Sequence, residues 1–257
     1  MEELTAGQFY LVYNAFSFTI ATMAAATIFF WLGRSQVAPA YKTAMTVTGL
    51  VTFIAFYHYV RIFESWASAY EVVDGQVELT GVLFNQAYRY VDWLLTVPLL
   101  LIELILVMRL SRSETVSKSI TLGSAAALMI VLGYPGETSG GIDGPRFLWG
   151  ALAMIPFLYI VYVLFTGLTK SIAEQPESVR GLVDIARYVT VGSWCFYPVV
   201  YFAPFIIPVD GGTGTAIIEV GYTIADIVAK AVFGVVIFMI AIRKSELETN
   251  QSQPATA

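Results

Sequence analysis

Two ionisable residues one helical turn apart, Asp226 and Lys230, lie in an otherwise apolar stretch near the end of the chain. A spacing of four residues places both side chains on one face of a helix, where they can interact directly. Burial favours the neutral form of an amine, and a neutral lysine can attack an aldehyde to form an imine. The pair therefore indicates either a structural ion pair or a reactive amine. A protonated imine here would need carboxylate counterions, for which Asp226 and Asp92 are candidates.

A second apolar stretch carries Arg89, Asp92, Thr96 and Glu103. The last three share one stripe of a helix, and the two carboxyls lie about 16 Å apart along its axis. Arg89 is expected about one turn outside Asp92. Glu103, surrounded by leucines and isoleucine, is expected to keep its proton at neutral pH, as a proton donor must. The alternative is a side chain that reaches the cytoplasmic interface.

His58, the only histidine, is expected near the outer end of another apolar stretch, at a depth similar to that of Asp92. It is either a hydrogen-bonded packing residue or a partner that tunes Asp92. Cys195 is the single cysteine, so no intramolecular disulfide can form, and we expect it to pack. One histidine and one cysteine do not predict a metal site.

The composition indicates a membrane protein. Of 257 residues, 57% are hydrophobic and 13% are charged, against about 25% charged in soluble domains. No basic patch predicts binding to nucleic acid. The chain starts with Glu2 and Glu3 rather than a basic segment, so no cleavable signal peptide is expected. Because an ionised side chain at the bilayer centre costs roughly 2.5 to 3.5 kcal/mol, the charged residues inside the apolar stretches indicate a functional site.

Apolar stretches long enough to cross a bilayer predict an all-α membrane protein, a bundle of seven transmembrane helices. The expected ranges are 8–32, 41–63, 82–110, 117–134, 146–169, 184–208 and 215–242. Residues 1–245 are expected to form one transmembrane domain, and the polar residues 246–257 a disordered tail. Between the second and third helices, Asp74-Gly75 within Val72 to Leu79 predicts a short β-hairpin. An irregular loop is the alternative.

The distribution of basic residues predicts the orientation. Ten Lys and Arg residues fall in the connections and tail on one side, and only Arg61 and Arg146 on the other. The positive-inside rule then puts the C-terminus in the cytoplasm and the N-terminus outside. That arrangement needs an odd number of spans, which seven satisfies.

Three segments of the sequence are together highly specific for one protein family. They are RYVDWLLTVP at 89–98, WCFYP at 194–198 and DIVAK at 226–230. On these segments the chain resembles microbial rhodopsins, specifically the proton-pumping proteorhodopsin and xanthorhodopsin groups, over essentially all seven spans. The resemblance implies a light-driven outward proton pump, an ion transporter rather than an enzyme. It also implies a homo-oligomer surrounded by lipid in a bacterial-type plasma membrane.

The resemblance assigns a role to each intramembrane residue. Lys230 matches the lysine that carries all-trans retinal as a protonated Schiff base. Asp92 matches the primary counterion and proton acceptor, and Asp226 the second counterion. Glu103 matches the cytoplasmic proton donor, and His58 the histidine that pairs with the acceptor. The other matching residues are Thr96, which completes an Asp, Thr, Glu pattern; the retinal-pocket walls Trp93, Trp194, Tyr197 and Pro198; and Leu100, whose type goes with green absorption.

Two positions distinguish the chain from bacteriorhodopsin. Gly150 stands where bacteriorhodopsin has a bulky Trp, and xanthorhodopsin-like pumps have Gly there and can dock a carotenoid antenna. Gly150 therefore permits a carotenoid, although glycine is also common at close helix contacts. Near the outer surface only Glu219 is found, where bacteriorhodopsin has paired glutamates, which puts early proton release in doubt.

The main alternative to a pump is a photosensory rhodopsin that signals to a transducer. Sensors have less need of an internal proton donor, so Glu103 favours the pump. Chloride pumps usually replace the acceptor carboxylate, and sodium pumps have Asn and Asp where this chain has Asp92 and Thr96. A hormone-type seven-helix receptor is disfavoured because no Asp-Arg-Tyr triplet follows the third span.

Overall fold

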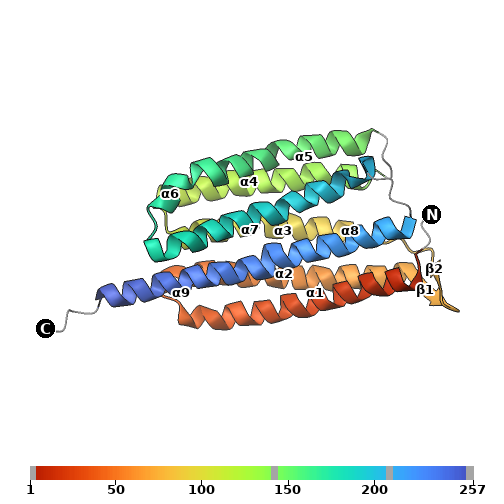
Figure 1. Cartoon of the computed structure of the whole chain (residues 1–257), viewed down its shortest axis with the longest axis horizontal. Helices are drawn as coiled ribbons and strands as arrows, with labels where there is room; N and C mark the ends of the chain where they lie inside the picture. The colour runs from red at the N-terminus through yellow and green to blue at the C-terminus, as the bar shows by residue number, and fades with distance from the viewer. Residues whose placement is uncertain (1–3, 140–143, 207–210, 253–257) are drawn as a thin grey trace.

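The computed structural model describes residues 4–139, 144–206 and 211–252, and in these the chain forms a bundle of long helices packed side by side (Figure 1). The helices are α1 (Ala6–Gly33), α2 (Lys42–Ala69), α3 (Ala87–Met108), α4 (Arg112–Glu137), α5 (Pro145–Tyr162), α6 (Thr169–Ala173), α7 (Glu177–Phe202), α8 (Gly211–Asp226) and α9 (Phe233–Ser252). Short 3₁₀ turns occur at Arg34–Gln36, Pro39–Tyr41 and Ala203–Phe205.

Two of the long rods are continuous through a π-helical segment. Val163–Gly167 joins α5 to α6, and Ile227–Val232 joins α8 to α9. The described residues therefore form seven helical rods, which confirms the predicted all-α bundle. By length and composition, six of these rods are apolar enough to cross a membrane. The exception, α7, carries Glu177, Arg180, Asp184 and Arg187 in its first turns.

Several helix ends follow from local sequence. Thr5 caps α1, since its side chain accepts a hydrogen bond from the backbone N–H of Gln8 (3.2 Å) while the Gln8 side chain accepts from the N–H of Thr5 (2.9 Å). Ser111 and Glu114 form the same capping box at the start of α4. Helix α3 ends at Met108 because Arg109 adopts left-handed backbone angles (φ 58°, ψ 50°).

The predicted β-hairpin is confirmed. Strands β1 (Tyr70–Val73) and β2 (Gln76–Leu79) pair antiparallel, with Val73 opposite Gln76. Asp74 and Gly75 both have positive φ, 49° and 80°, as a two-residue type I′ turn requires. The alternative of an irregular loop is therefore wrong. The hairpin lies at the end of the bundle where the chain begins (Figure 1).

The predicted disordered tail needs a correction, because α9 continues to Ser252. Residues 246–252 are therefore helical, and 253–257 lie outside the described residues. The extension is held by contacts that the polar composition does not reveal. The hydroxyl of Tyr41 donates to Glu248 (2.6 Å), and Arg243 pairs with Glu246 one turn on (3.1 Å). Such pairs one turn apart support a helix in polar sequence.

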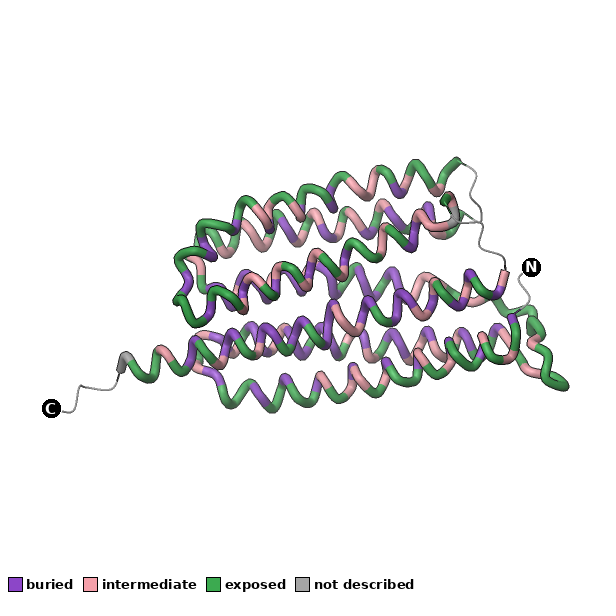
Figure 2. The backbone as a smooth tube through the Cα atoms, in the orientation of Figure 1, coloured by how far each residue is buried: buried purple, intermediate pink, exposed green. Residues whose placement is uncertain are grey.

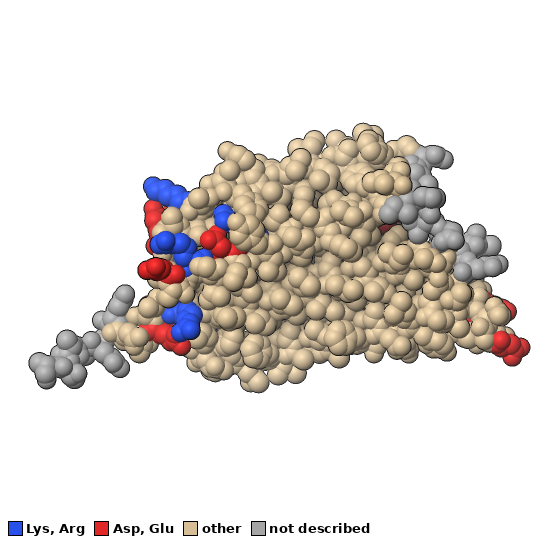
Figure 3. Space-filling view, in the orientation of Figure 1, with Lys and Arg blue, Asp and Glu red and all other residues tan. Residues whose placement is uncertain are grey.

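Burial follows the inner faces of the rods, while large apolar side chains remain exposed around the outside (Figure 2). Phe18 and Leu32, for example, are 65% and 68% exposed. An apolar outer surface of this kind is what lipid surroundings favour. Lys and Arg side chains gather at the end of the bundle where the C-terminus leaves, on the face that Figure 3 presents. The cytoplasmic location of that end stays a prediction.

Helix α9 packs closely on α1 and α2 at Gly234. A Cβ atom added there would lie 2.6 Å from Cζ of Phe30 and 2.8 Å from Cγ2 of Thr48, and both residues are buried. Gly192 on α7, in contrast, has no such neighbour within 4 Å.

We therefore expect Gly234→Ala to destabilise the bundle by about 1 to 3 kcal/mol, the usual cost of overpacking a tight contact. Gly192→Ala, the matched control, should leave stability unchanged or raise it by up to about 1 kcal/mol, because alanine is the better helix former. Thermal unfolding in detergent, followed by circular dichroism, measures both. Equal melting temperatures for the two variants would contradict the prediction.

Candidate functional site

The amine of Lys230 lies between two carboxylates. Its Nζ atom is 2.6 Å from Oδ1 of Asp226 and 2.8 Å from Oδ2 of Asp92. All three side chains are at most 1% exposed. The predicted contact between Asp226 and Lys230 is therefore present, and α3 brings Asp92 to the same nitrogen.

Asp226 is the more completely bonded of the two carboxylates. Its Oδ2 atom accepts a hydrogen bond from the hydroxyl of Tyr59 (2.7 Å). Its Oδ1 atom accepts from the hydroxyl of Tyr197 (2.7 Å) and from Nε1 of Trp93 (3.1 Å). Tyr59 is not among the site residues predicted from the sequence, and Trp93 and Tyr197 are predicted only as walls of the retinal pocket. The available signal was that a buried Tyr or Trp usually finds a partner for its polar atom.

The carboxylate of Asp92 has fewer neighbours. Thr96 donates to the main-chain oxygen of Asp92 (2.8 Å) rather than to its side chain. Nδ1 of His58 lies 3.9 Å from Oδ1 of Asp92, but it is also 2.9 Å from the carbonyl oxygen of Ile54 in its own helix. His58 is thus beside Asp92, as expected, while its nearest hydrogen-bond partner is its own backbone.

Arg89 lies one turn from Asp92, as predicted, but its guanidinium pairs with Glu219 on α8. Gln86 also donates to Glu219, and the guanidinium stacks over the ring of Tyr222, 5.1 Å from its centroid. These residues form a buried polar group between the Lys230 site and the hairpin end of the bundle.

A second carboxylate, which the sequence analysis did not single out, lies toward the same end. Glu137 at the end of α4 pairs with Arg146 at the start of α5 (3.2 Å), and both side chains are mostly buried. The expectation that Glu219 is the only glutamate in this region is therefore wrong. The reason is that Glu137 comes from a different helix, whose rotation the sequence does not fix.

Glu103 lies on the opposite side of Asp92 along α3 and is completely buried. The alternative, a side chain that reaches the interface, is thus wrong. Neither carboxyl oxygen has a hydrogen bond to the described residues, although Thr48 of α2 lies beside it. Its neighbours in α3, Leu100, Leu101 and Leu104, are buried with it. Glu103 therefore sits in mainly apolar surroundings, with Thr48 as a polar neighbour.

An apolar cavity extends from Lys230 between α3, α4, α5, α7 and α8. The expected wall residues all line it: Trp93, Leu100, Gly150, Trp194, Tyr197 and Pro198. With an amine at one end and aromatic walls along its length, the cavity suits a long apolar molecule that carries one aldehyde.

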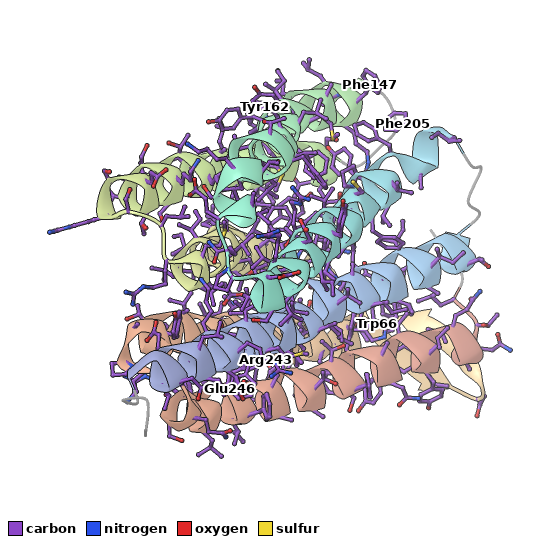
Figure 4. All side chains as sticks on the ribbon, turned by 60° about the vertical axis from the view of Figure 1, so that its left-hand side comes forward. Trp66, Phe147, Tyr162, Phe205, Arg243 and Glu246 are labelled. Atoms are coloured by element: carbon purple, nitrogen blue, oxygen red, sulfur yellow. The ribbon has the colours of Figure 1, made fainter. Side chains whose placement is uncertain are left out.

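Gly150 faces the rings of Tyr201 and Phe202. A Cβ atom at this position would lie 2.5 Å from Cε1 of Tyr201 and 2.7 Å from Cζ of Phe202. Phe147 extends this aromatic group, with ring centroids 6.0 Å from Phe202 and 5.8 Å from Phe205. Figure 4 shows Phe147 and Phe205 near each other at one end of the bundle. A side chain at position 150 would therefore require the rings of Tyr201 and Phe202 to move.

Comparison with known proteins agrees with this geometry. A family model described as bacteriorhodopsin-like protein matches residues 12–244. The green-light absorbing proteorhodopsin of gamma-proteobacterium EBAC31A08 is 34% identical over 238 residues, which cover 91% of this chain and 88% of that protein. Bacteriorhodopsin of Halobacterium salinarum is 29% identical over 84% of this chain and 79% of its own length.

Two solved structures are similar over nearly the whole chain. The structure of xanthorhodopsin, described as a light-driven ion pump with dual chromophore, superposes with a TM-score of 0.92 at 51% identity. It covers 97% of this chain and 99% of the other. The structure of thermophilic rhodopsin has the same TM-score of 0.92 at 48% identity and covers 96% and 99% of the two chains.

Asp226 accepts more hydrogen bonds than Asp92, and this difference gives a prediction about stability. Asp226→Leu leaves the polar atoms of Tyr59, Tyr197 and Trp93 without their acceptor, at roughly 1 to 3 kcal/mol for each buried group that finds no other partner. The matched variant Asp92→Leu leaves only Lys230 with one carboxylate fewer. Thermal unfolding of the protein without added ligand should therefore show the larger loss for Asp226→Leu. An equal or smaller loss would contradict the hydrogen-bond assignments.

Proposed function

This chain belongs to the bacteriorhodopsin-like protein family, and on that premise we propose that it is a light-driven pump that moves protons outward across a membrane. The observation that supports this most is the arrangement around Lys230. Its amine lies between Asp92 and Asp226 at the end of an aromatic cavity, and a third carboxyl, Glu103, is buried on the other side.

The cofactor we propose is all-trans retinal, which, when bound through its aldehyde to Lys230, supplies absorption of visible light and a light-driven change of shape. The chain's own residues supply the rest of the site. Trp93, Trp194, Tyr197 and Pro198 give the cavity its apolar walls, which exclude water from the amine. Leu100 lies in the same wall, and we propose green rather than blue absorption on that basis.

Asp92 is the proposed proton acceptor. Its Oδ2 atom is already at hydrogen-bond distance from the Lys230 nitrogen, so a proton can pass between them without a large movement. Asp226 is the proposed second counterion, because its four donors hold it in place as a fixed negative charge. Thr96 and His58 position Asp92 from one turn along α3 and from α2, and Arg89 with Glu219 lies next on the way out.

Glu103 is the proposed donor that returns a proton to the Lys230 nitrogen. Its buried, mainly apolar surroundings favour a carboxyl that carries a proton, and it lies between the site and the end where α9 terminates. Outward transport requires the nitrogen to exchange with Asp92 first and Glu103 afterwards. The change of access between these two steps is a conformational switch.

We further propose a bacterial plasma membrane as the location, with the C-terminus in the cytoplasm. The basic end of the bundle supports this orientation (Figure 3). Residues 1–245 form the proposed retinal-binding domain, and self-association into a homo-oligomer is part of the same proposal.

A carotenoid antenna beside Gly150 is also proposed. Gly150 lines the cavity, and the nearby lipid-facing side chains Phe147 and Leu148 are each 58% exposed. A long apolar pigment could therefore lie along this face with one end close to the cavity.

Illumination of unbuffered cells that contain the protein and retinal should acidify the medium, and a protonophore should abolish the effect. Lys230→Ala should remove both the visible absorption band and the acidification, because no other amine lies at the end of the cavity among the described lining residues. A pH electrode and an absorption spectrum are sufficient. Light-dependent acidification that persists in Lys230→Ala would overturn the proposal.

A photosensory rhodopsin with the same cavity is distinguished by Glu103→Gln. A pump should lose proton return by a factor of about 100 or more, the usual size of a general acid's contribution. Slow photocycling of the wild type that Glu103→Gln leaves unaltered would favour the sensor.

The antenna proposal predicts that an added carotenoid gives the wild type a structured absorption band, and that Gly150→Trp prevents this while keeping the retinal band. The indole would displace the rings of Tyr201 and Phe202 and fill this side of the cavity. Gly192→Trp on α7, where a Cβ meets nothing within 4 Å, is the control and should still bind. Equal binding by both variants would exclude docking at Gly150.

A further inference from the structure

The cytoplasmic end of α3, which carries Glu103, is held by side chains from two distant parts of the chain. Nζ of Lys244 on α9 donates to the carbonyl oxygens of Val107 (2.9 Å) and Met108 (3.0 Å). Nε2 of Gln175, between α6 and α7, also donates to Met108 (3.2 Å). The last carbonyls of a helix have no hydrogen-bond partner within the helix. The side chains of Lys244 and Gln175 therefore satisfy the last carbonyls of α3.

Lys244 is an unusual residue for this position because it is only 5% exposed. Among the described residues no carboxylate lies within 4.0 Å of its ammonium. Its charge is instead balanced by the negative end of the α3 dipole and by the ring of Tyr41, 5.9 Å away. With these partners, the buried ammonium of Lys244 is bound to the C-terminal end of α3.

The neighbours of Lys244 fix its own location. The hydroxyl of Ser245 accepts a hydrogen bond from the backbone N–H of Ala38 (2.8 Å), and Glu248 accepts one from Tyr41 (2.6 Å). The end of α9 is thus tied to the connection between α1 and α2. Lys244 therefore reaches α3 from a fixed support.

The segment held in this way contains Glu103. Pro98 interrupts the hydrogen bonds of α3, because it has no N–H to offer the carbonyl of Leu94. The hydrogen bonds of α3 are therefore interrupted between the part that carries Asp92 and the part from Pro98 to Met108, in which Glu103 lies one turn before the carbonyl of Val107. The Glu103 oxygens make no hydrogen bond of good geometry to the described residues, although Thr48 lies beside them, so the placement of this side chain depends mainly on the backbone that carries it.

We infer that Lys244 is a positioning residue for Glu103, which holds the cytoplasmic half of α3 by bonding its last two carbonyls. Lys244 also lies on the same helical rod as Lys230, about 21 Å further along its axis. One rod therefore supports both the proposed attachment site and the helix of the proposed proton donor. This inference rests on the proposed function for its kinetic consequence, but the structural link can be tested without it.

The test compares Lys244→Met with Arg243→Met. Arg243 is the adjacent basic residue on α9, but its side chain is 61% exposed and pairs with Glu246 (3.1 Å). Figure 4 labels Arg243 and Glu246 near the end of α9. In flash photolysis with retinal, we expect Lys244→Met to slow proton return to the Lys230 nitrogen about tenfold, equivalent to about 1.4 kcal/mol in the barrier. Arg243→Met should stay within about twofold of the wild type.

Two further readouts separate positioning from general destabilisation. Azide, a small weak acid that can reach the nitrogen from solution, should restore the rate in Lys244→Met, and Lys244→Arg should keep most of the wild-type rate. In the dark, the infrared carboxyl band assigned with Glu103→Gln should shift in Lys244→Met and not in Arg243→Met. A rate and a band equal to those of Arg243→Met, or a slow cycle that azide does not correct, would overturn the inference.

If Lys244→Met does not accumulate, Gln175→Leu removes the other donor to Met108 and should shift the same band and slow proton return by a smaller factor. No change in either measurement would then overturn the inference. The infrared measurement needs neither light nor transport. A wild type that does not pump would therefore refute the proposed function while the dark band still decides whether Lys244 positions Glu103.

Discussion

A buried amine held between two buried carboxylates is the interaction on which this bundle depends. Charges taken out of water persist only when they are paired and hydrogen-bonded, and removing one partner leaves an uncompensated charge. Lys230 and Asp226 come from one helical rod and Asp92 from α3, while α2 and α7 supply the tyrosines that bond Asp226. Four rods are therefore fixed around one nitrogen atom, and the apolar cavity beside it is a consequence of how they meet.

Two of the helical rods that carry this site depart from regular α-helix close to the site residues. The rod with Lys230 is π-helical over Ile227–Val232, and single π turns are frequent at functional sites because they change the direction of side chains. Helix α3 contains Pro98 between Asp92 and Glu103. Regular helix keeps the backbone satisfied in lipid, and these two departures lie beside the amine and between the two carboxyls of α3.

The two ends of the bundle differ in the partners of their buried charged side chains. Toward the hairpin, arginines pair with glutamates between helices, as Arg89 does with Glu219 and Arg146 with Glu137. Toward the other end, Glu103 is buried without an ion pair to the described residues, and the buried Lys244 bonds to main-chain carbonyls. A polar half and an apolar half on opposite sides of one amine make the two directions unequal, which any directional transfer of protons across it requires.

The sequence by itself determined the features that depend on local spacing. Apolar length predicted the seven rods, Asp74-Gly75 predicted the hairpin, and the interval of four between Asp226 and Lys230 predicted their contact. Contacts between helices were decided only by the tertiary structure: Tyr59 with Asp226, Glu219 with Arg89, and Lys244 with the end of α3. These pairs are separated by 130 or more residues. Periodicity places a residue on a face of its own helix, whereas the rotation of each helix against its neighbours follows from the packing of the whole bundle.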